Sequence, residues 1–187
     1  NRIYSTWVNV VSNGLFVKYG AREYQATSLT VIAESPDPIG VTNATMRGQI
    51  THTGNAENPK AYICWDSTDK GTVSTANWAN VVYVGTNWGQ GQAFSTNING
   101  LVSGNSYSYR CYVTNSTGKD FSDTVQTFNT IGIPTLTNTG AGAVGHWTAT
   151  LQGVVTNTGG EAPSIWFDYW KSGGAVTTRV AMGIQNG

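Results

Sequence analysis

Hydrophobic and polar residues alternate with a period of two through most of this chain of 187 residues. In residues 44–51, for example, Ala44, Met46 and Ile50 alternate with polar side chains. This pattern is typical of β-strands with one buried face, and no stretch sustains the 3.6-residue period of a helix. The alternation predicts an all-β chain with strands at residues 28–33, 44–51, 60–66, 81–85, 92–98, 107–114 and 124–129.

The sequence also repeats itself. The segment from Ala44 to Gly54 recurs 105 residues later, beginning at Ala149, and Pro59 matches Pro163 at an offset of 104. A period of about one hundred residues is the size of a β-sandwich domain. We therefore expect one complete copy at residues 29–133 and the first half of a second copy at 134–187, with strands at 135–139, 147–156, 164–171 and 176–182.

The most specific motif precedes the predicted strand 107–114. Asn99-Gly100-Leu101 is followed by Gly104 and by Tyr107, which lies six residues after Leu101. This motif resembles the corner between two strands in the fibronectin type III-like and immunoglobulin-like repeats of bacterial extracellular proteins. The seven predicted strands agree with such a sandwich.

The resemblance implies an antiparallel β-sandwich with two fold markers, Leu101 and Tyr107. Leu101 would pack beneath the corner, and the Tyr107 hydroxyl would bond to the backbone of the corner. Alternation along the following strand then places Tyr109, Cys111 and Val113 inside the sandwich, and Ser108, Arg110 and Tyr112 outside it.

Residues 1–28 form a further segment, with apolar stretches on both sides of Asn13-Gly14. Asn-Gly between such stretches predicts a β-hairpin. Alignment of Gly14 with Gly118, at an offset of 104, places this hairpin where the last two strands of a preceding copy would lie. Unpaired strand edges favour pairing with another chain, so the hairpin of one subunit could complete the half copy of the next and build a filament. The alternative is an excerpt of a longer protein, in which the second copy is truncated.

The composition narrows the choice of partners and location. Ten basic and ten acidic residues give a formal net charge of zero, which argues against nucleic acid as a partner. No apolar run is long enough to insert in a membrane as a helix. The abundance of Thr, Ser, Asn and Gly resembles secreted bacterial surface proteins, so we expect an extracellular or cell-surface location.

No arrangement of residues points to catalysis or to a bound metal. His52 and His146 lie apart, and neither has a nearby motif of nucleophilic catalysis. Asp66 and Asp69, before the turn at Gly71, are too few to predict a calcium site. We expect a protein that is not an enzyme and needs no cofactor.

The two cysteines, Cys64 and Cys111, are candidates for a disulfide. The family resemblance places them on neighbouring strands, and disulfides are common in secreted domains. The alternative is two free thiols. The repeat pairs Trp65 with Tyr169 as inward residues, which would turn Cys64 outward while Cys111 faces inward.

Trp166 and Trp170 alternate with Ile165, Phe167 and Tyr169, so one of these two sets should be exposed on the half copy. Exposed tryptophans favour either an interface with another chain or the stacking of sugar rings. Trp78 and Trp88, in the long connection before the strand 92–98, are expected to pack over the sandwich.

Two sequons, at Asn43 and Asn115, are candidate glycosylation sites, although chance alone accounts for their number. Together, these features predict a non-catalytic extracellular subunit of a filament, sheath or matrix that binds copies of itself head-to-tail. The alternative is a carbohydrate-binding or adhesin module of a secreted multi-domain protein, with glycans as its partners.

Overall fold

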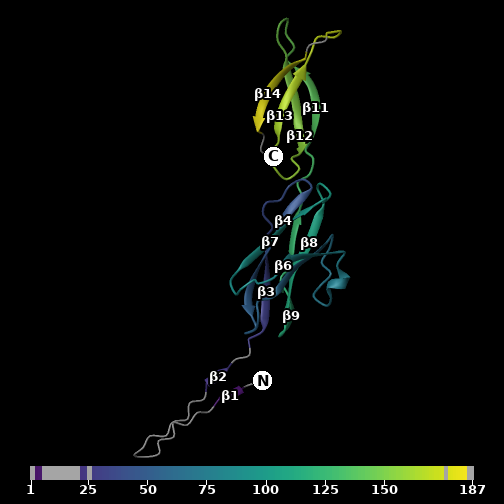
Figure 1. The fold of residues 1–187 in the computed structure, drawn as a ribbon. Coiled ribbons are helices and arrows are strands. Elements are labelled where there is room, and N and C mark those ends of the chain that lie inside the picture. The colour runs from purple at the N-terminus through teal and green to yellow at the C-terminus, as the bar shows by residue number, and fades with distance from the viewer. Residues whose placement is uncertain (1–2, 6–21, 25–26, 175–176, 185–187) are drawn as a thin grey trace, which may run out of the picture. The chain divides into compact units, whose positions relative to one another are not determined.

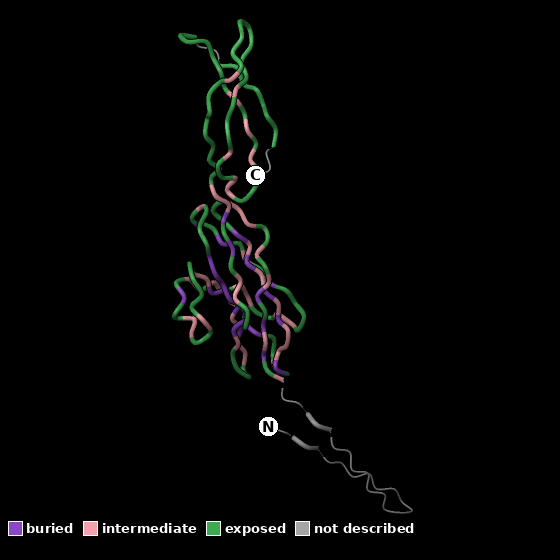
Figure 2. The backbone as a smooth tube through the Cα atoms, turned by 180° about the vertical axis from the view of Figure 1, so that it is seen from behind, coloured by how far each residue is buried: buried purple, intermediate pink, exposed green. Residues whose placement is uncertain are grey.

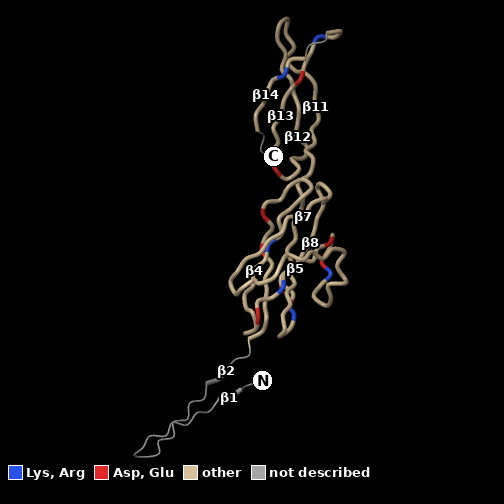
Figure 3. The backbone as a smooth tube through the Cα atoms, viewed as in Figure 1, with Lys and Arg blue, Asp and Glu red and all other residues tan. Residues whose placement is uncertain are grey.

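The structure is a computed structural model that describes residues 3–5, 22–24, 27–174 and 177–184. Within these residues the chain is all-β, as predicted: the pairing of its strands is antiparallel, and η1 (Thr75–Asn77), a short 3-10 turn, is the only helical element (Figure 1). No helix of the described part is long and apolar enough to cross a membrane. Charged positions are sparse along the described backbone (Figure 3).

Two sheets account for the strands between residues 29 and 129. A three-stranded sheet has the order β3-β4-β7, and a second sheet has the order β10-β8-β5-β6, with β9 paired to β8. The three-stranded sheet contains β3 (Leu29–Glu34), β4 (Asn43–Thr53) and β7 (Ala93–Asn99). The second contains β5 (Lys60–Asp66), β6 (Asn80–Gly85), β8 (Ser106–Asn115), β9 (Gly118–Phe121) and β10 (Gln126–Asn129).

Strand β9 was not predicted, because the sequence suggested a turn over residues 115–119. The turn is tighter than that. Asn115 pairs with Gly118, which leaves two residues between them, and the Asn115 Oδ1 atom accepts a hydrogen bond from the Thr117 amide at 3.1 Å. Gly118 has a φ of 153°, a conformation that glycine adopts readily, so the chain resumes strand pairing at once.

The chain divides into two compact units. Asn1–Ser35, Arg47–Ser95 and Tyr109–Gln126 form the first unit. Pro36–Met46, Thr96–Ser108 and Thr127–Gly187 form the second.

The core of the first unit is built from alternate residues of its strands, including the fully buried Ile50, Ile63 and Val113 (Figure 2). Burial of each such side chain stabilises the fold by about 1.5–3 kcal/mol. Tyr109 is also fully buried, and its hydroxyl contacts the main chain of two other strands. It donates to the Glu34 carbonyl and accepts from the Arg47 amide at 3.2 Å, so one side chain connects β8 to β3 and β4.

Arg110 lies on the opposite face of β8 from Tyr109, as the resemblance implied, but only 8% of it is exposed. Its guanidinium donates to both carboxylate oxygens of Asp69, at 2.9 and 2.6 Å, and to the carbonyls of Ser122 and Asp123 at 2.6 and 2.7 Å. The connection between β5 and β6 therefore covers a face that alternation alone would leave to solvent.

Trp78, in the same connection, is buried, and its Nε1 atom donates to the Gly71 carbonyl at 3.2 Å. It packs in a cluster with Cys64 and Phe121. Trp88 is half-buried, with its ring centre 5.7 Å from that of Phe94.

The second unit contains the corner between β7 and β8. Leu101 and Tyr107 are both buried, and the Val102 amide donates to the Tyr107 hydroxyl at 2.9 Å. The Thr130 hydroxyl donates to the Val102 carbonyl at 2.6 Å, which holds the corner from a second side.

Near the N-terminus, β1 (Ile3–Ser5) pairs with β2 (Arg22–Tyr24), and each pair of residues is centred between Asn13 and Gly14. This is the register that a hairpin turning at Asn13-Gly14 produces. The predicted turn itself lies outside the described residues. The centre of the β8–β9 turn lies between Ser116 and Thr117. The alignment of Gly14 with Gly118 stays a prediction.

Candidate functional site

The C-terminal part of the second unit consists of two hairpins, which we call the C-terminal hairpin pair. The first pairs β11 (Thr135–Gly142) with β12 (Thr150–Asn157), and the second pairs β13 (Ser164–Tyr169) with β14 (Thr178–Ile184) (Figure 1). Each hairpin is a separate two-stranded sheet in the described part of the chain.

From Thr135 to Asn138, the first of these hairpins has the same register as β3 and β4, whereas its second register shift, between Asn138 and Gly140, has no counterpart there. Leu136 pairs with Val155, just as Val31 pairs with Ile50 at an offset of 105 residues. A register shift precedes both pairs, between Thr135 and Leu136 and between Thr30 and Val31. Paired threonine hydroxyls lie beside both shifts, Thr135–Thr156 at 2.9 Å and Thr30–Thr51 at 2.6 Å.

The second hairpin has the same register as β5 and β6. Ile165 pairs with Gly183, as Ala61 pairs with Gly85, and a register shift follows each pair. The next aligned pairs include Phe167 with Val180, which corresponds to Ile63 with Val82 at an offset of 104 on the first strand.

The turns that join the corresponding hairpins are also alike. The Gly54 amide donates to His52 Nδ1 at 3.0 Å, and the Gly159 amide donates to Asn157 Oδ1 at 2.8 Å. Both glycines have a positive φ, 73° and 78°, and each is followed by a second residue with a positive φ. The local backbone therefore repeats through two hairpins and the turn between them.

Corresponding positions in the two sets of hairpins differ in how far they are buried. Val31 is 3% exposed and Ile63 is fully buried, whereas Leu136 is 60% exposed and Phe167 is half-buried. None of the described residues between 131 and 184 is buried (Figure 2). The C-terminal hairpin pair thus has the strand pairing of the other hairpins without their core.

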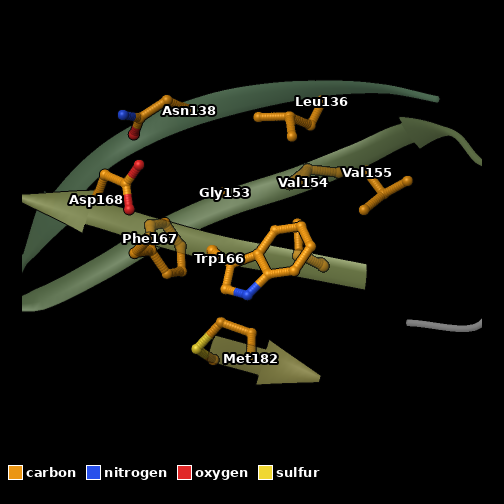
Figure 4. A pocket seen from close by; sticks show the side chains of 10 residues that line it. Leu136, Asn138, Gly153, Val154, Val155, Trp166, Phe167, Asp168 and Met182 are labelled. Atoms are coloured by element: carbon orange, nitrogen blue, oxygen red, sulfur yellow. The ribbon is translucent and has the colours of Figure 1, made fainter. Parts of the chain in front are cut away.

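Two open grooves lie between the hairpins. The first, which we call the β11–β13 groove, has a volume of about 410 Å³, with Leu136 and Val155 at one end and Asn138 and Asp168 at the other (Figure 4). The second has a volume of about 520 Å³ and is lined by residues that include Leu151, Tyr169 and Val180. Phe167 and Met182 line both grooves.

At the place in the first unit that corresponds to the β11–β13 groove, β8 and β9 fill the space. The Val31 amide donates to Asp120 of β9 at 3.0 Å. A Cβ atom added to Gly48 would lie 2.3 Å from the Cys111 sulfur of β8. A Cβ atom added to Gly153, the counterpart of Gly48, would have the Thr137 carbonyl oxygen as its nearest neighbour, at 3.3 Å, followed by the Phe167 ring at 3.6 Å, so it would meet no atom of a third strand as closely as Gly48 meets Cys111. The space that β8 occupies is open in the hairpin pair.

The two tryptophans singled out in the sequence are exposed, Trp166 at 51% and Trp170 at 62%. Arg179 lies 5.7 Å from the centre of the Trp166 ring and donates to both Asp168 oxygens at 2.7 Å. These hydrogen bonds hold the pKa of Asp168 below its usual range. The result is an exposed aromatic surface beside a fixed ion pair.

The two cysteines are free thiols, so the candidate disulfide is not present in this structure. Cys64 packs with Trp78, Phe121 and Tyr112, whereas Cys111 faces the other way, against Gly48. Cys64 lies on β5 and Cys111 on β8, and their side chains point to opposite faces of the sheet that contains both strands. Burial raises the pKa of Cys64 to about 12 and also raises the pKa of Cys111.

The two sequons have different surroundings. Asn43 is exposed, but the Asn115 Nδ2 atom, to which a glycan would attach, donates to the carbonyls of Thr53 and Glu57 at 2.8 and 3.0 Å. Glycosylation remains a prediction, and these contacts favour Asn43 over Asn115.

The described residues contain no group of three or more side chains suited to a metal ion. Asp69 is bound to Arg110, and Asp66 accepts hydrogen bonds from the Ser67 and Ala79 amides at 2.6 and 3.1 Å. Both carboxylates are therefore engaged within the fold.

Sequence reasoning did not identify the residues that line the β11–β13 groove, apart from Trp166. The signal was nevertheless available, because the repeat places Leu136 at the position of the core residue Val31 and Gly153 at that of Gly48. What the repeat could not reveal is whether anything in the chain covers these positions.

A scan against models of protein families and a search of curated proteins both find no match. Solved structures similar to the chain include the sensor domain of the anti-sigma factor RsgI4 from Pseudobacteroides cellulosolvens. A short version of that domain is 15% identical, with a TM-score of 0.41, and the match covers 58% of this chain and 100% of that one.

Its solution structure is also 15% identical, with a TM-score of 0.41 and coverages of 56% and 76%. A long version is 17% identical, with a TM-score of 0.36 and coverages of 57% and 92%. These scores add nothing to the all-β architecture that the strands themselves show.

Proposed function

We propose that the chain is an extracellular structural subunit that assembles head-to-tail into a filament, sheath or matrix. In this proposal, the β11–β13 groove of one subunit receives the N-terminal hairpin, residues 1–28, of another copy. The hairpin would occupy the position that β8 and β9 occupy in the first unit, where β8 pairs with β5 and β9 contacts β3. Each contact would join two different surfaces, so the assembly would extend without closing.

One observation carries the proposal. Leu136 and Val31 occupy matching positions in hairpins of the same register, yet 60% of Leu136 is exposed against 3% of Val31. Exposed apolar positions in a repeated sheet pattern mark a surface that another chain can cover. A second copy is the occupant we favour, because residues 3–5 and 22–24 pair antiparallel, as β8 and β9 do in the first unit.

The order of the strands within the two sheets supports a more specific proposal, that residues 29–129 form a fibronectin type III-like sandwich. In that assignment, β3, β4 and β7 form one layer, and β6, β5, β8 and β10 form the other. The bond between Val102 and the Tyr107 hydroxyl is the corner contact that the resemblance implies. Tandem sandwiches suit a mechanical role because each completed unit buries its own core.

Sedimentation of the full chain and of a variant without residues 1–28 tests the proposal. The full chain should form a ladder of oligomers, and the shortened variant should stay monomeric. The shortened variant can accept a hairpin but cannot donate one, so a small amount added to the full chain should shorten the oligomers. A monomeric full chain, or oligomers that persist without residues 1–28, would contradict the proposal.

A second candidate function is glycan binding, for which the exposed Trp166 and the Asp168–Arg179 pair provide a specific observation. Aromatic faces stack on sugar rings, and a fixed ion pair can bind hydroxyl groups. In this case, binding to immobilised glycans should disappear in Trp166→Ala and Trp170→Ala. Binding that ignores both changes would remove this candidate.

A further inference from the structure

In the first unit, a carboxylate of β9 accepts a hydrogen bond from the main chain of the edge strand β3. The Val31 amide donates to Asp120 Oδ2 at 3.0 Å, directly after the register shift between Thr30 and Val31. The Val31 N–H therefore points toward β9, and β4 lies on the other side of β3. Burial raises the pKa of Asp120 above its usual range, and the hydrogen bond from Val31 opposes this shift. The first unit thus places a partly desolvated carboxylate where its edge strand presents an amide.

The Leu136 amide has the corresponding place in the C-terminal hairpin pair. Leu136 directly follows the matching register shift, 105 residues after Val31, so we expect its N–H to point away from β12. In the described part of the chain, β12 is the one partner of β11, which makes β11 an edge strand as β3 is. Leu136 lines the β11–β13 groove, and no described side chain accepts a hydrogen bond from its amide.

The polar side chains of the groove itself are engaged elsewhere. Asp168 and Asn138 lie at the opposite end of the groove from Leu136 (Figure 4). Both Asp168 oxygens accept from Arg179 at 2.7 Å, and Asn138 Oδ1 accepts from the Gly140 amide at 2.9 Å. An acceptor for the Leu136 amide must therefore come from the strand that enters the groove.

We propose that the β11–β13 groove selects a β-hairpin whose second strand carries a carboxylate, and that this carboxylate accepts a hydrogen bond from the Leu136 amide as Asp120 does from the Val31 amide. This inference rests on the proposed function and adds to it the chemistry that the groove recognises. An apolar strand without an acceptor would bury the Leu136 N–H unpaired, which costs free energy. A charged acceptor forms a stronger hydrogen bond than a neutral one, so the groove should discriminate between the two.

A synthetic peptide of residues 106–121 is the probe, because it contains β8, β9 and the turn between them. The peptide, labelled at its N-terminus and kept reduced, should bind the dilute full chain with a saturable rise in fluorescence anisotropy. The same peptide with Asp120→Asn should bind about tenfold more weakly, since a neutral acceptor replaces a charged one.

Variants of the full chain locate the contact. Leu136→Pro removes the N–H of this residue, whereas Leu136→Ala shortens the side chain and keeps the N–H. Proline is tolerated on an edge strand, so the hairpin should persist in Leu136→Pro. The tenfold preference for the peptide with Asp120 should therefore vanish in Leu136→Pro and remain in Leu136→Ala.

Three results would overturn the inference: equal binding of the two peptides to the native chain, a preference that persists in Leu136→Pro, or no binding of either peptide. Each of them would leave head-to-tail assembly standing, because sedimentation of the full chain decides that proposal with no peptide present.

Discussion

Arg110 binds the connection between β5 and β6 to strand β8 through its hydrogen bonds to Asp69. Its guanidinium is nearly buried and donates to Asp69 and to two carbonyls, so removal of the Asp69 charge leaves a buried cation without its carboxylate. We expect Asp69→Asn to lower the free energy of unfolding by about 2 kcal/mol, measured by urea denaturation. Asp168→Asn is the control, because its pair with Arg179 has the same geometry at the surface and should have no measurable effect.

The same pair predicts a dependence on pH. Hydrogen bonds from Arg110 hold the pKa of Asp69 below its usual range in the folded chain. A lowered pKa contributes stability above the unfolded value, about 4, and this contribution is lost as the pH falls below it. Between pH 5 and pH 3, the native chain should therefore lose more stability than Asp69→Asn. If urea titrations at pH 5 and pH 3 showed the same loss of stability for the native chain and for Asp69→Asn, the Asp69–Arg110 pair would not be the source of the pH dependence.

The cysteines give a chemical prediction at the same scale. Both are fully buried, and burial raises their pKa values, so little thiolate is available to react. Ellman's reagent at pH 8 should find no reactive thiol in the folded chain and two after denaturation. Absence of thiols in the denatured chain would show that the disulfide forms after all.

At the scale of elements, Gly48 and Gly153 are a matched pair. Gly48→Ala should destabilise the fold by about 1–3 kcal/mol, because the added Cβ would overlap the Cys111 sulfur and lie 2.8 Å from the Phe94 ring. Gly153→Ala should lower the urea midpoint of the isolated subunit less than Gly48→Ala does, since its nearest contact is the Thr137 carbonyl at 3.3 Å instead of a sulfur at 2.3 Å. It should nevertheless weaken assembly, because an incoming strand would need that space. Assembly of Gly153→Ala at the native concentration would contradict this account of the groove.

Most strands could be predicted from sequence, because alternation of period two survives wherever one face is buried. Strand β5, for instance, begins at Lys60 and ends at Asp66, as predicted. Strand β9 could not be predicted, because its four residues are too few to show a pattern beside a tight turn. Arg110 was assigned to the correct face, but alternation carries no information about the loop that covers it.

The candidate site was predictable only in part, for a similar reason. Alternation identified Trp166 and Trp170 as opposite to Phe167, and the structure leaves both tryptophans exposed. The exposure of Leu136 could not be foreseen, since its position in the repeat is that of a buried residue. Sequence shows that a side chain belongs in a core, but only structure shows whether the described chain supplies that core.

At the scale of the whole molecule, the low charge is consistent with repeated packing of identical subunits. A formal net charge of zero leaves little long-range repulsion between copies. The proposed assembly also explains why apolar residues such as Leu136, Val154 and Ile184 are exposed in one chain, because such surfaces are normally covered.

Negative-stain electron microscopy of the natively isolated protein, without denaturant, tests head-to-tail completion most directly. The account predicts long regular fibres whose axial repeat corresponds to one or two sandwich lengths. Monodisperse small particles at the same concentration would contradict it, and would leave glycan binding through Trp166 and Trp170 as the function to pursue.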